Sequence, residues 1–331
     1  MTRRETVIHS FLTAHGYGRA TMQPLAQDAS FRRYWRLVGG PCPAVLMDAP
    51  PPEDVRPFLH VGAHLARLGA SVPETLAAEA ESGLLLIEDF GDGLLPTLLS
   101  PDTEAMLFDA AVDVLAAMQR VPAPDGLPAW DPATMAATAS GTLLDWWWPA
   151  AFGTPAPDAA RSDFTEALAD LLRPLAVEQP VFVHRDFFTG NLMWLPDRSG
   201  LRRIGVLDFQ GAARGHPAYD LASLIGDCRR DVSPAIAERA VGRFLLLRPE
   251  LDGGAMQTAV AICAAQRHLR VAGQWVRLAQ RDSRTQYLAH GPRTWRLLAE
   301  ALRHPPAAPL ARAFDRWIPP ERRGNPPGLP A

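Results

Sequence analysis

The stretch VFVHRDFFTGNLMWLPDRSGLRRIGVLDFQGA, residues 181–212, decides the fold of this chain. It contains three short apolar runs that are typical of strands, at 181–183, 192–195 and 204–207. Polar side chains adjoin these runs: Asp186 in an HRD triplet, Asn191 five residues later, and Asp208 in a DFQ triplet. We therefore expect the strands to hold two carboxylates and one amide rigidly at a cleft.

These three residue types at this spacing indicate phosphoryl transfer. The reaction needs a carboxylate that orients the acceptor hydroxyl and accepts its proton, together with oxygen ligands for Mg²⁺ on the nucleotide phosphates. Asp186 is the candidate catalytic residue, and Asn191 with Asp208 are the candidate metal ligands. An HxD triplet alone is common, but HxDxxxxN followed by an apolar run that ends in DF is a specific combination.

On these motifs the chain resembles the aminoglycoside phosphotransferase/choline kinase superfamily. The resemblance extends to GHPAYDLA at 215–222, where Asp220 would bond backbone amides of the catalytic loop and His184 would be a scaffold residue. It implies an α+β, two-lobed, protein-kinase-like fold with a small β-rich N-terminal lobe and a large helical C-terminal lobe. It also implies ATP and Mg²⁺ as cofactors.

The chain of 331 residues is about twice the usual size of one domain, which agrees with two lobes. We expect a nucleotide-binding lobe at 1–90, a catalytic and substrate-binding helical lobe at 91–304, and a Pro-rich tail at 305–331. Periodicity and turn residues predict the other elements. Helices are expected at 5–14, 54–68, 104–119, 134–152, 163–177 and within 218–303, and strands at 22–25, 30–38, 43–47 and 84–87.

The chain has no lysine, since all 33 of its Lys and Arg residues are arginine. Nucleotide-composition bias is the simplest origin of this, but it excludes any mechanism that depends on a lysine. The strand-3 lysine that the resemblance implies would fall at Met47. Its acidic partner is also missing from the following helix, because residues 56–68 contain no Asp or Glu. The absence of both members of this ion pair is self-consistent, because a single buried charge left without its partner would be energetically costly.

The nucleotide site implied by the resemblance falls on two segments. Ser30, Arg32 and Arg33 lie in the turn expected over the phosphates, where Ser30 offers a hydroxyl and an arginine supplies charge. No GxGxxG is present there. Glu88 and Phe90 lie where the family's hinge holds adenine through backbone groups. With Asp186, Asn191 and Asp208 all intact, we favour an active kinase over a nucleotide-binding pseudokinase.

The C-terminal helical region points to an anionic acceptor. Residues 255–303 contain eight arginines against two acids. Part of this set recurs at helical spacing: Arg267, Arg270, Gln274, Arg277, Arg281 and Arg284. Most of these side chains would form a solvated face, and one or two could bind a carboxylate.

The resemblance narrows to the anomeric N-acetylmuramate/N-acetylglucosamine kinases of peptidoglycan recycling. It rests on SFRRYWRL, AVLMDAPPPEDVRPF, IGVLDFQGAARGHPAYDLASLIGDCRRDV and AAQRHLRVAGQWVRLAQRDSRTQYL. It implies ATP-dependent phosphorylation of the C1 hydroxyl of an amino sugar, with Arg267 and His268 as candidate substrate contacts. The lactyl carboxylate of N-acetylmuramate would suit an arginine-rich pocket. The alternative is another small-molecule kinase of the superfamily, of the aminoglycoside, choline or homoserine type.

The remaining features are less specific. At most one indole of Trp146–Trp148 can face a sugar, because consecutive helical residues diverge by about 100°, and packing between helices is the simpler role. A net charge of −3 gives no indication of nucleic-acid or membrane binding. Three distant cysteines and no apolar run of about 20 residues predict a cytoplasmic protein without disulfides. We expect a monomer.

Overall fold

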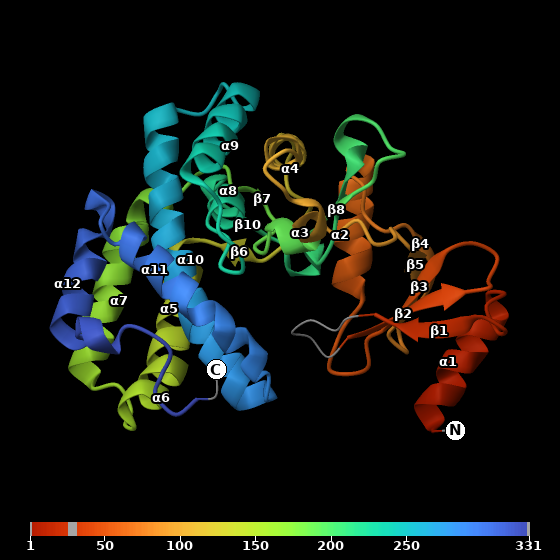
Figure 1. The fold of residues 1–331 in the computed structure, drawn as a ribbon, viewed down its shortest axis with the longest axis horizontal. Helices are drawn as coiled ribbons and strands as arrows, with labels where there is room; N and C mark the ends of the chain where they lie inside the picture. Colours follow the sequence, from red (N-terminus) through yellow and green to blue (C-terminus); the bar gives the residue numbers. More distant parts are fainter. Residues whose placement is uncertain (1, 26–31, 330–331) are drawn as a thin grey trace. The chain divides into compact units, whose positions relative to one another are not determined.

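The computed structural model describes residues 2–25 and 32–329, and the chain divides into two compact units (Figure 1). Their bounds are Met1–Leu99 with Gly190–Gly211 for the first unit, and Ser100–Thr189 with Ala212–Ala331 for the second. The first of these compact units extends to Leu99 and includes residues 190–211 from later in the chain. One reason is a strand-like bridge between Ser71 and Gly205.

The first unit is built on an antiparallel sheet of strand order β1-β2-β3-β5-β4. The strands are β1 (Thr21–Pro24), β2 (Arg33–Val38), β3 (Ala44–Asp48), β4 (Thr75–Glu79) and β5 (Leu84–Glu88). The α+β fold and four of these strands are confirmed. Strand β4 was missed because its sequence TLAAE is short and mostly exposed, and it offers little of the alternation that marks a strand.

The two faces of this sheet carry different side chains, as the period of two requires. One face packs against α1 (Arg3–Ala14), which lies along the sheet in Figure 1. The apolar core on this side consists of Ile8, Phe11, Leu12, Tyr17, Leu37, Ala44, Leu46, Leu84 and Leu86. The opposite face carries Tyr34 and Met47, which are register partners across β2 and β3. Met47 is fully buried there.

Helix α2 (Arg56–Arg67) and the hairpin of β8 (Leu192–Trp194) and β9 (Ile204–Val206) complete the first unit with short helices. The short elements are α3 (Leu95–Leu98), η3 (Thr189–Asn191), η4 (Gly200–Arg203) and η5 (Phe209–Gly211). Phe209 anchors the segment after β9 to α2, since its ring centroid lies 4.7 Å from that of Phe58. A Cβ at Gly62 of α2 would lie 3.3 Å from the same ring.

The second unit is mainly helical. Its helices are α4 (Glu104–Met118), α5 (Pro132–Thr142), the π-helical η1 (Leu143–Trp147), α6 (Trp148–Phe152), α7 (Asp158–Leu172), α8 (Ala218–Ile225), α9 (Pro234–Leu247), α10 (Gly253–Asp282), α11 (Gly291–Ala301) and α12 (Ala308–Trp317). Its 3₁₀ turns are η2 (Arg173–Leu175), η6 (Thr285–His290), η7 (Pro305–Ala307) and η8 (Pro320–Arg322). A small sheet, β6-β10-β7, joins Ala129–Trp130, Ala213–Gly215 and Val181–Val183.

The segment expected as a Pro-rich tail is instead part of the core of the second unit. Helix α12 has a proline in its first turn, where the missing N–H costs no hydrogen bond. Leu310 and Phe314 of this helix are fully buried. The Phe314 ring meets Phe164 of α7 edge-on at 5.3 Å between centroids, and α7 and α12 lie side by side in Figure 1.

The tryptophan run lies in the same unit and is largely a packing feature, as expected. Trp147 is fully buried, donates through Nε1 to the Gly324 carbonyl at 2.8 Å, and lies 5.0 Å from the ring of Trp295. Trp148 is also buried, whereas Trp146 is half-buried.

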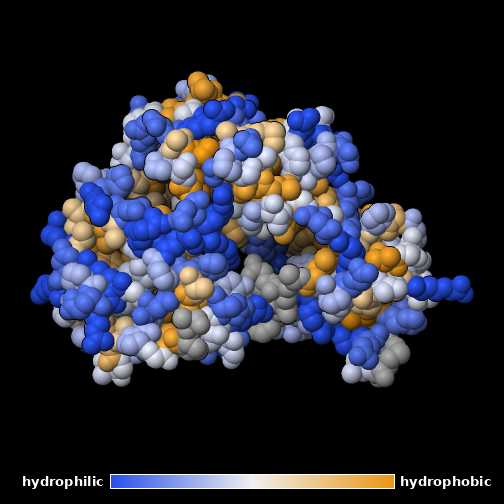
Figure 2. Space-filling model, viewed as in Figure 1, coloured by the Kyte–Doolittle hydropathy of each residue, from blue (hydrophilic) through white to orange (hydrophobic). Residues whose placement is uncertain are grey.

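Across residues 2–25 and 32–329, no helix combines the length and apolar character that crossing a membrane requires. Figure 2 shows a mostly hydrophilic visible face on which apolar residues form small groups.

We predict opposite stability effects for two glycine substitutions in helices. A Cβ at Gly273 of α10 would lie 2.3 Å from the Thr142 carbonyl oxygen, so Gly273→Ala forces two helices apart and should destabilise by about 1–3 kcal/mol. Gly242 in α9 has open space around that position, so Gly242→Ala should stabilise by up to about 1 kcal/mol. Urea unfolding of both variants checks this. Equal changes in the free energy of unfolding would refute the close helix crossing.

Candidate active site

The loop after β7 is held by a buried carboxylate from α8. Asp220 accepts hydrogen bonds from the backbone amides of His184 at 2.6 Å and Arg185 at 2.9 Å. This confirms the structural role expected for Asp220. Arg185 has a φ of +75°, a conformation that L-residues rarely adopt, and the two amide bonds hold the loop in it. Burial raises the pKa of Asp220 to about 6.

Asp186 follows directly in this loop, and its carboxylate is 49% exposed. His184 is buried, and its Nδ1 accepts the Asp186 amide at 3.3 Å, which fits the scaffold role. Arg270 of α10 lies beside this carboxylate, with 3.7 Å between Nη2 and Oδ1 of Asp186. Desolvation alone would raise the pKa of Asp186, but the charges of Arg270, then Arg267, outweigh it and the pKa is lowered. The carboxylate is therefore held in its ionised form.

Helix α10 and the loop surround Asp186 with more positive than negative charge. The Arg185 guanidinium lies 4.1 Å from the ring centroid of Trp130. Its pKa is lowered by burial and by the nearby charge of Arg270. Arg267 is 3% exposed and donates from Nη1 to Cys228 Sγ at 3.7 Å. An excess of arginine over carboxylate at this position would stabilise an anion.

Two residues of α10 near Arg267 differ in how the sequence treated them: His268 was a candidate substrate contact, and Arg270 was not. His268 is 3% exposed, its Nε2 lies 3.0 Å from the Gly226 carbonyl oxygen, and burial lowers its pKa to about 4. It is therefore a neutral interior residue. Arg270 was not selected from the sequence, although it lies three residues beyond Arg267 in the same arginine stripe.

Asn191 and Asp208 lie at the same end of the β8–β9 hairpin in the first unit. Strand register pairs Leu192 with Val206, and the Leu207 amide donates to the Asn191 carbonyl at 2.9 Å. Asp208 has a φ of +59°, and its carboxylate, 45% exposed, accepts from Gln210 Nε2 at 2.5 Å. The hairpin thus explains how residues 17 positions apart in the sequence come together.

This pair suits Mg²⁺ in its donor chemistry. An amide oxygen and a carboxylate are hard ligands, and Mg²⁺ is usually bound by one or two such side chains, with waters and substrate phosphates completing the shell. Among residues 2–25 and 32–329, no group of three or more His, Cys, Asp or Glu side chains could hold a metal by itself.

The two arginines that the sequence left equivalent have different partners in the structure. Arg33 pairs with fully buried Asp48 on the α1 face, at 2.5 Å from Nη2 to Oδ2. Arg32 contacts two other carboxylates: its Nε lies 3.1 Å from Glu53 Oε2 and its Nη1 lies 3.7 Å from Asp208 Oδ1. Arg32 is therefore the arginine beside the candidate metal ligand.

Arg32 also has an acidic partner, which the sequence did not predict. Helix α2 contains no acid, as noted, but Glu53 lies just before the helix begins at Arg56. The acidic pair Glu53 and Asp54 in PPPED is the signal that could have found it. Ser30, the other predicted phosphate contact, lies outside the described residues.

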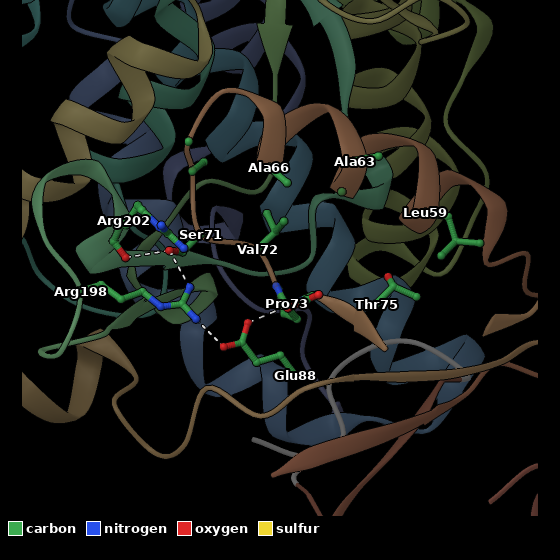
Figure 3. A pocket seen from close by; sticks show the side chains of 14 residues that line it. Leu59, Ala63, Ala66, Ser71, Val72, Pro73, Thr75, Glu88, Arg198 and Arg202 are labelled. Atoms are coloured by element: carbon green, nitrogen blue, oxygen red, sulfur yellow. Dashed lines mark hydrogen bonds and ion pairs between the residues drawn. The ribbon is translucent and has the colours of Figure 1, made fainter. Parts of the chain in front are cut away.

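The end of β5 and the residue Phe90 after it contact neighbouring residues through backbone and side-chain groups. The Glu88 amide donates to the Glu74 carbonyl at 2.8 Å, and its carboxylate pairs with Arg198 (Figure 3). This pair borders a hollow of about 680 Å³ beside α2. The Phe90 ring lies 5.0 Å from the same Arg198 guanidinium. The Glu88 carboxylate and backbone amide are thus both bonded within the protein, and the predicted adenine contact of this segment stays a prediction.

A kinase-like sheet, an ionised aspartate in an HRD loop and an Asn/Asp pair on a hairpin define a phosphotransferase. The family model described as the phosphotransferase enzyme family matches residues 21–254. The chain belongs to this family.

Similar proteins support the assignment. The chain is 35% identical to the N-acetylmuramate/N-acetylglucosamine kinase of Caulobacter vibrioides, with 97% of this chain and 99% of the relative covered. It is also 35% identical to the enzyme of the same name from Pseudomonas aeruginosa, over 92% of each chain. Among solved structures, a GDP complex of aminoglycoside 2′-phosphotransferase-IIIa matches with a TM-score of 0.62 and 13% identity, over 91% of this chain and 98% of that one.

We predict that Asp220→Asn destabilises the protein. The amide keeps one acceptor oxygen but loses the charge and the second acceptor for the loop amides, which should cost about 1–3 kcal/mol. Asp231→Asn is the control, because Asp231 is 65% exposed and its pairs with Arg293 and Arg296 should contribute under about 1 kcal/mol. Thermal unfolding measures both. A loss no larger for Asp220→Asn than for the control would contradict the anchoring role.

Proposed function

We propose that the protein transfers the γ-phosphoryl group of ATP to the C1 hydroxyl of N-acetylmuramate, N-acetylglucosamine or both, a reaction of peptidoglycan recycling. The observation that carries this proposal is an ionised, half-exposed Asp186 set among arginines, in a chain whose named relatives match over nearly their whole length. Because ATP is the donor, we place the reaction in the cytoplasm.

Asp186 acts mainly by orienting the sugar hydroxyl. A carboxylate whose pKa is lowered is a weak base, so it accepts a hydrogen bond from the hydroxyl more readily than it removes the proton early. Phosphoryl transfer passes through a loose transition state in which little proton transfer is needed before the phosphoryl group moves. The proton then passes to Asp186 late, as the new oxygen–phosphorus bond forms.

Arg32 would bind the nucleotide phosphates, and Asn191 with Asp208 would hold Mg²⁺. When bound, the metal would neutralise charge on the β- and γ-phosphates. Arg32 lies just before β2 and interacts with Tyr34, the register partner of Met47, and it supplies the cation that the missing lysine would have provided. Glu53 holds the guanidinium in place through the contact at Nε. An Arg–Glu pair thus replaces a Lys–Glu pair, with its acid moved from the helix to the loop before it.

The charge around Asp186 favours an anionic sugar over a cationic acceptor. Arg267 and Arg270 approach this carboxylate from α10, and choline or an aminoglycoside would meet their repulsion. The carboxylate of N-acetylmuramate is attracted by these positive charges, and N-acetylglucosamine, which is uncharged, is not repelled by them.

A panel of acceptors tests the proposal. With Mg²⁺-ATP, phosphorylation should be seen with N-acetylmuramate or N-acetylglucosamine and not with choline or kanamycin. Asp186→Asn should lower kcat by about 10²–10⁴-fold while the Kd for ATP stays within twofold. Preference for a cationic acceptor, or unchanged turnover of Asp186→Asn, would overturn the assignment.

Substitutions of the two adjacent arginines test the phosphate contact. Arg32→Ala should raise the Kd and KM for ATP by roughly ten- to hundredfold, the loss of one charge-assisted hydrogen bond. Glu53→Gln keeps the Arg32 charge but weakens its positioning, and should give a smaller increase. Arg33→Ala is the matched control, because Arg33 pairs with Asp48 on the other face and its loss should affect stability alone. A larger rise in Kd for Arg33→Ala than for Arg32→Ala would reverse the assignment.

A further inference from the structure

Helix α10 exposes one narrow polar stripe within the second unit. Between Ala265 and Ala279 every residue is buried except Arg270, Gln274 and Arg277. Their spacing of four and three residues places them on one face of the helix. The accessible surface of this part of α10 is therefore a single line of polar side chains.

One end of the stripe lies at the proposed catalytic residue. Arg270 Nη2 is 3.7 Å from Asp186 Oδ1. Arg277 lies seven residues further on, which is about 10 Å along the helix axis. Helical side chains tilt toward the N-terminus of the helix, so we expect the Arg277 side chain to shorten this distance to one that a hexose with an acidic substituent can span.

The other end of the stripe meets the half-buried member of the tryptophan run. The Arg277 guanidinium carbon lies 5.9 Å from the ring centroid of Trp146. Their meeting follows from the close crossing at Gly273 and Thr142, four residues earlier in each segment. The π-helical turn η1 carries Trp146, and such turns are frequent at functional sites.

Arg277 lacks the partners that an interior arginine normally has. Within residues 2–25 and 32–329, its guanidinium makes the contact with Trp146 and no hydrogen bond or ion pair. Burial and the neighbouring Arg281 charge lower its pKa. The Asp282 charge opposes this lowering in part, but Asp282 forms its ion pair with Arg281, so Arg277 has no ion pair of its own and a ligand carboxylate can supply one. Arg281, one turn on, differs because it pairs with Asp282 at 2.8 Å.

We propose that Arg277 binds the lactyl carboxylate of N-acetylmuramate while Trp146 contacts the sugar ring, so that Arg277 sets the preference for N-acetylmuramate over N-acetylglucosamine. This inference rests on the proposed function. Arg277 would distinguish the two amino sugars through the lactyl carboxylate, which N-acetylmuramate has and N-acetylglucosamine lacks.

The test compares acid and neutral ligands. Calorimetry with the full-length protein should show Arg277→Gln weakening N-acetylmuramate binding by roughly ten- to hundredfold. Binding of N-acetylglucosamine and of the methyl ester of N-acetylmuramate should stay within twofold. Arg277→Lys should recover part of the loss, and Arg281→Gln, the matched control, should bind all three ligands like the parent protein. Trp146→Ala should weaken all three.

Two failures are distinguishable. In the first, the parent protein phosphorylates an amino sugar, but Arg277→Gln weakens binding of N-acetylmuramate and of its methyl ester equally, or changes neither. The carboxylate site is then refuted and the proposed function stands. If the parent protein phosphorylates neither amino sugar, both proposals fail together.

Discussion

The two backbone amides that share the Asp220 carboxylate are the contact on which the active-site loop depends. Without this acceptor, two buried N–H groups would be unsatisfied and Arg185 would have no reason to keep its positive φ. Asp186 is the next residue in the chain, so these hydrogen bonds to Asp220 also fix its position. Arginines of α10 then keep its carboxylate ionised, which favours orienting a hydroxyl over abstracting its proton.

In the first unit, an arginine is in a position to supply the charge of the missing lysine. Arg33, the first residue of β2, pairs with Asp48, whereas Arg32, just before the strand, interacts with Tyr34, the register partner of Met47. A guanidinium from the residue just before β2 can supply the same charge as an ammonium on β3, provided that an acid holds it. Glu53 fulfils this condition from outside the helix, because it comes from the loop before α2.

Much of the fold and part of the site could be predicted from the sequence. The HRD, Asn and DF spacing indicated the candidate catalytic segment, and short strand-like runs bounded by turn residues predicted β2, β3 and β5. Strands β4, β6 and β10 were missed because they are very short or mostly exposed. Glu53 and Arg270 were missed for another reason: their partners are distant in sequence, so only tertiary contacts identify them. Helix α12 was hidden by flanking prolines that begin the helix rather than prevent it.

The central claim is phosphoryl transfer to the anomeric hydroxyl of an amino sugar. Phosphorus NMR of the product formed from N-acetylmuramate and Mg²⁺-ATP tests it most directly. The account predicts a new resonance coupled to the anomeric proton of the sugar. A resonance coupled instead to the methylene protons at C6, or release of inorganic phosphate alone, would contradict it.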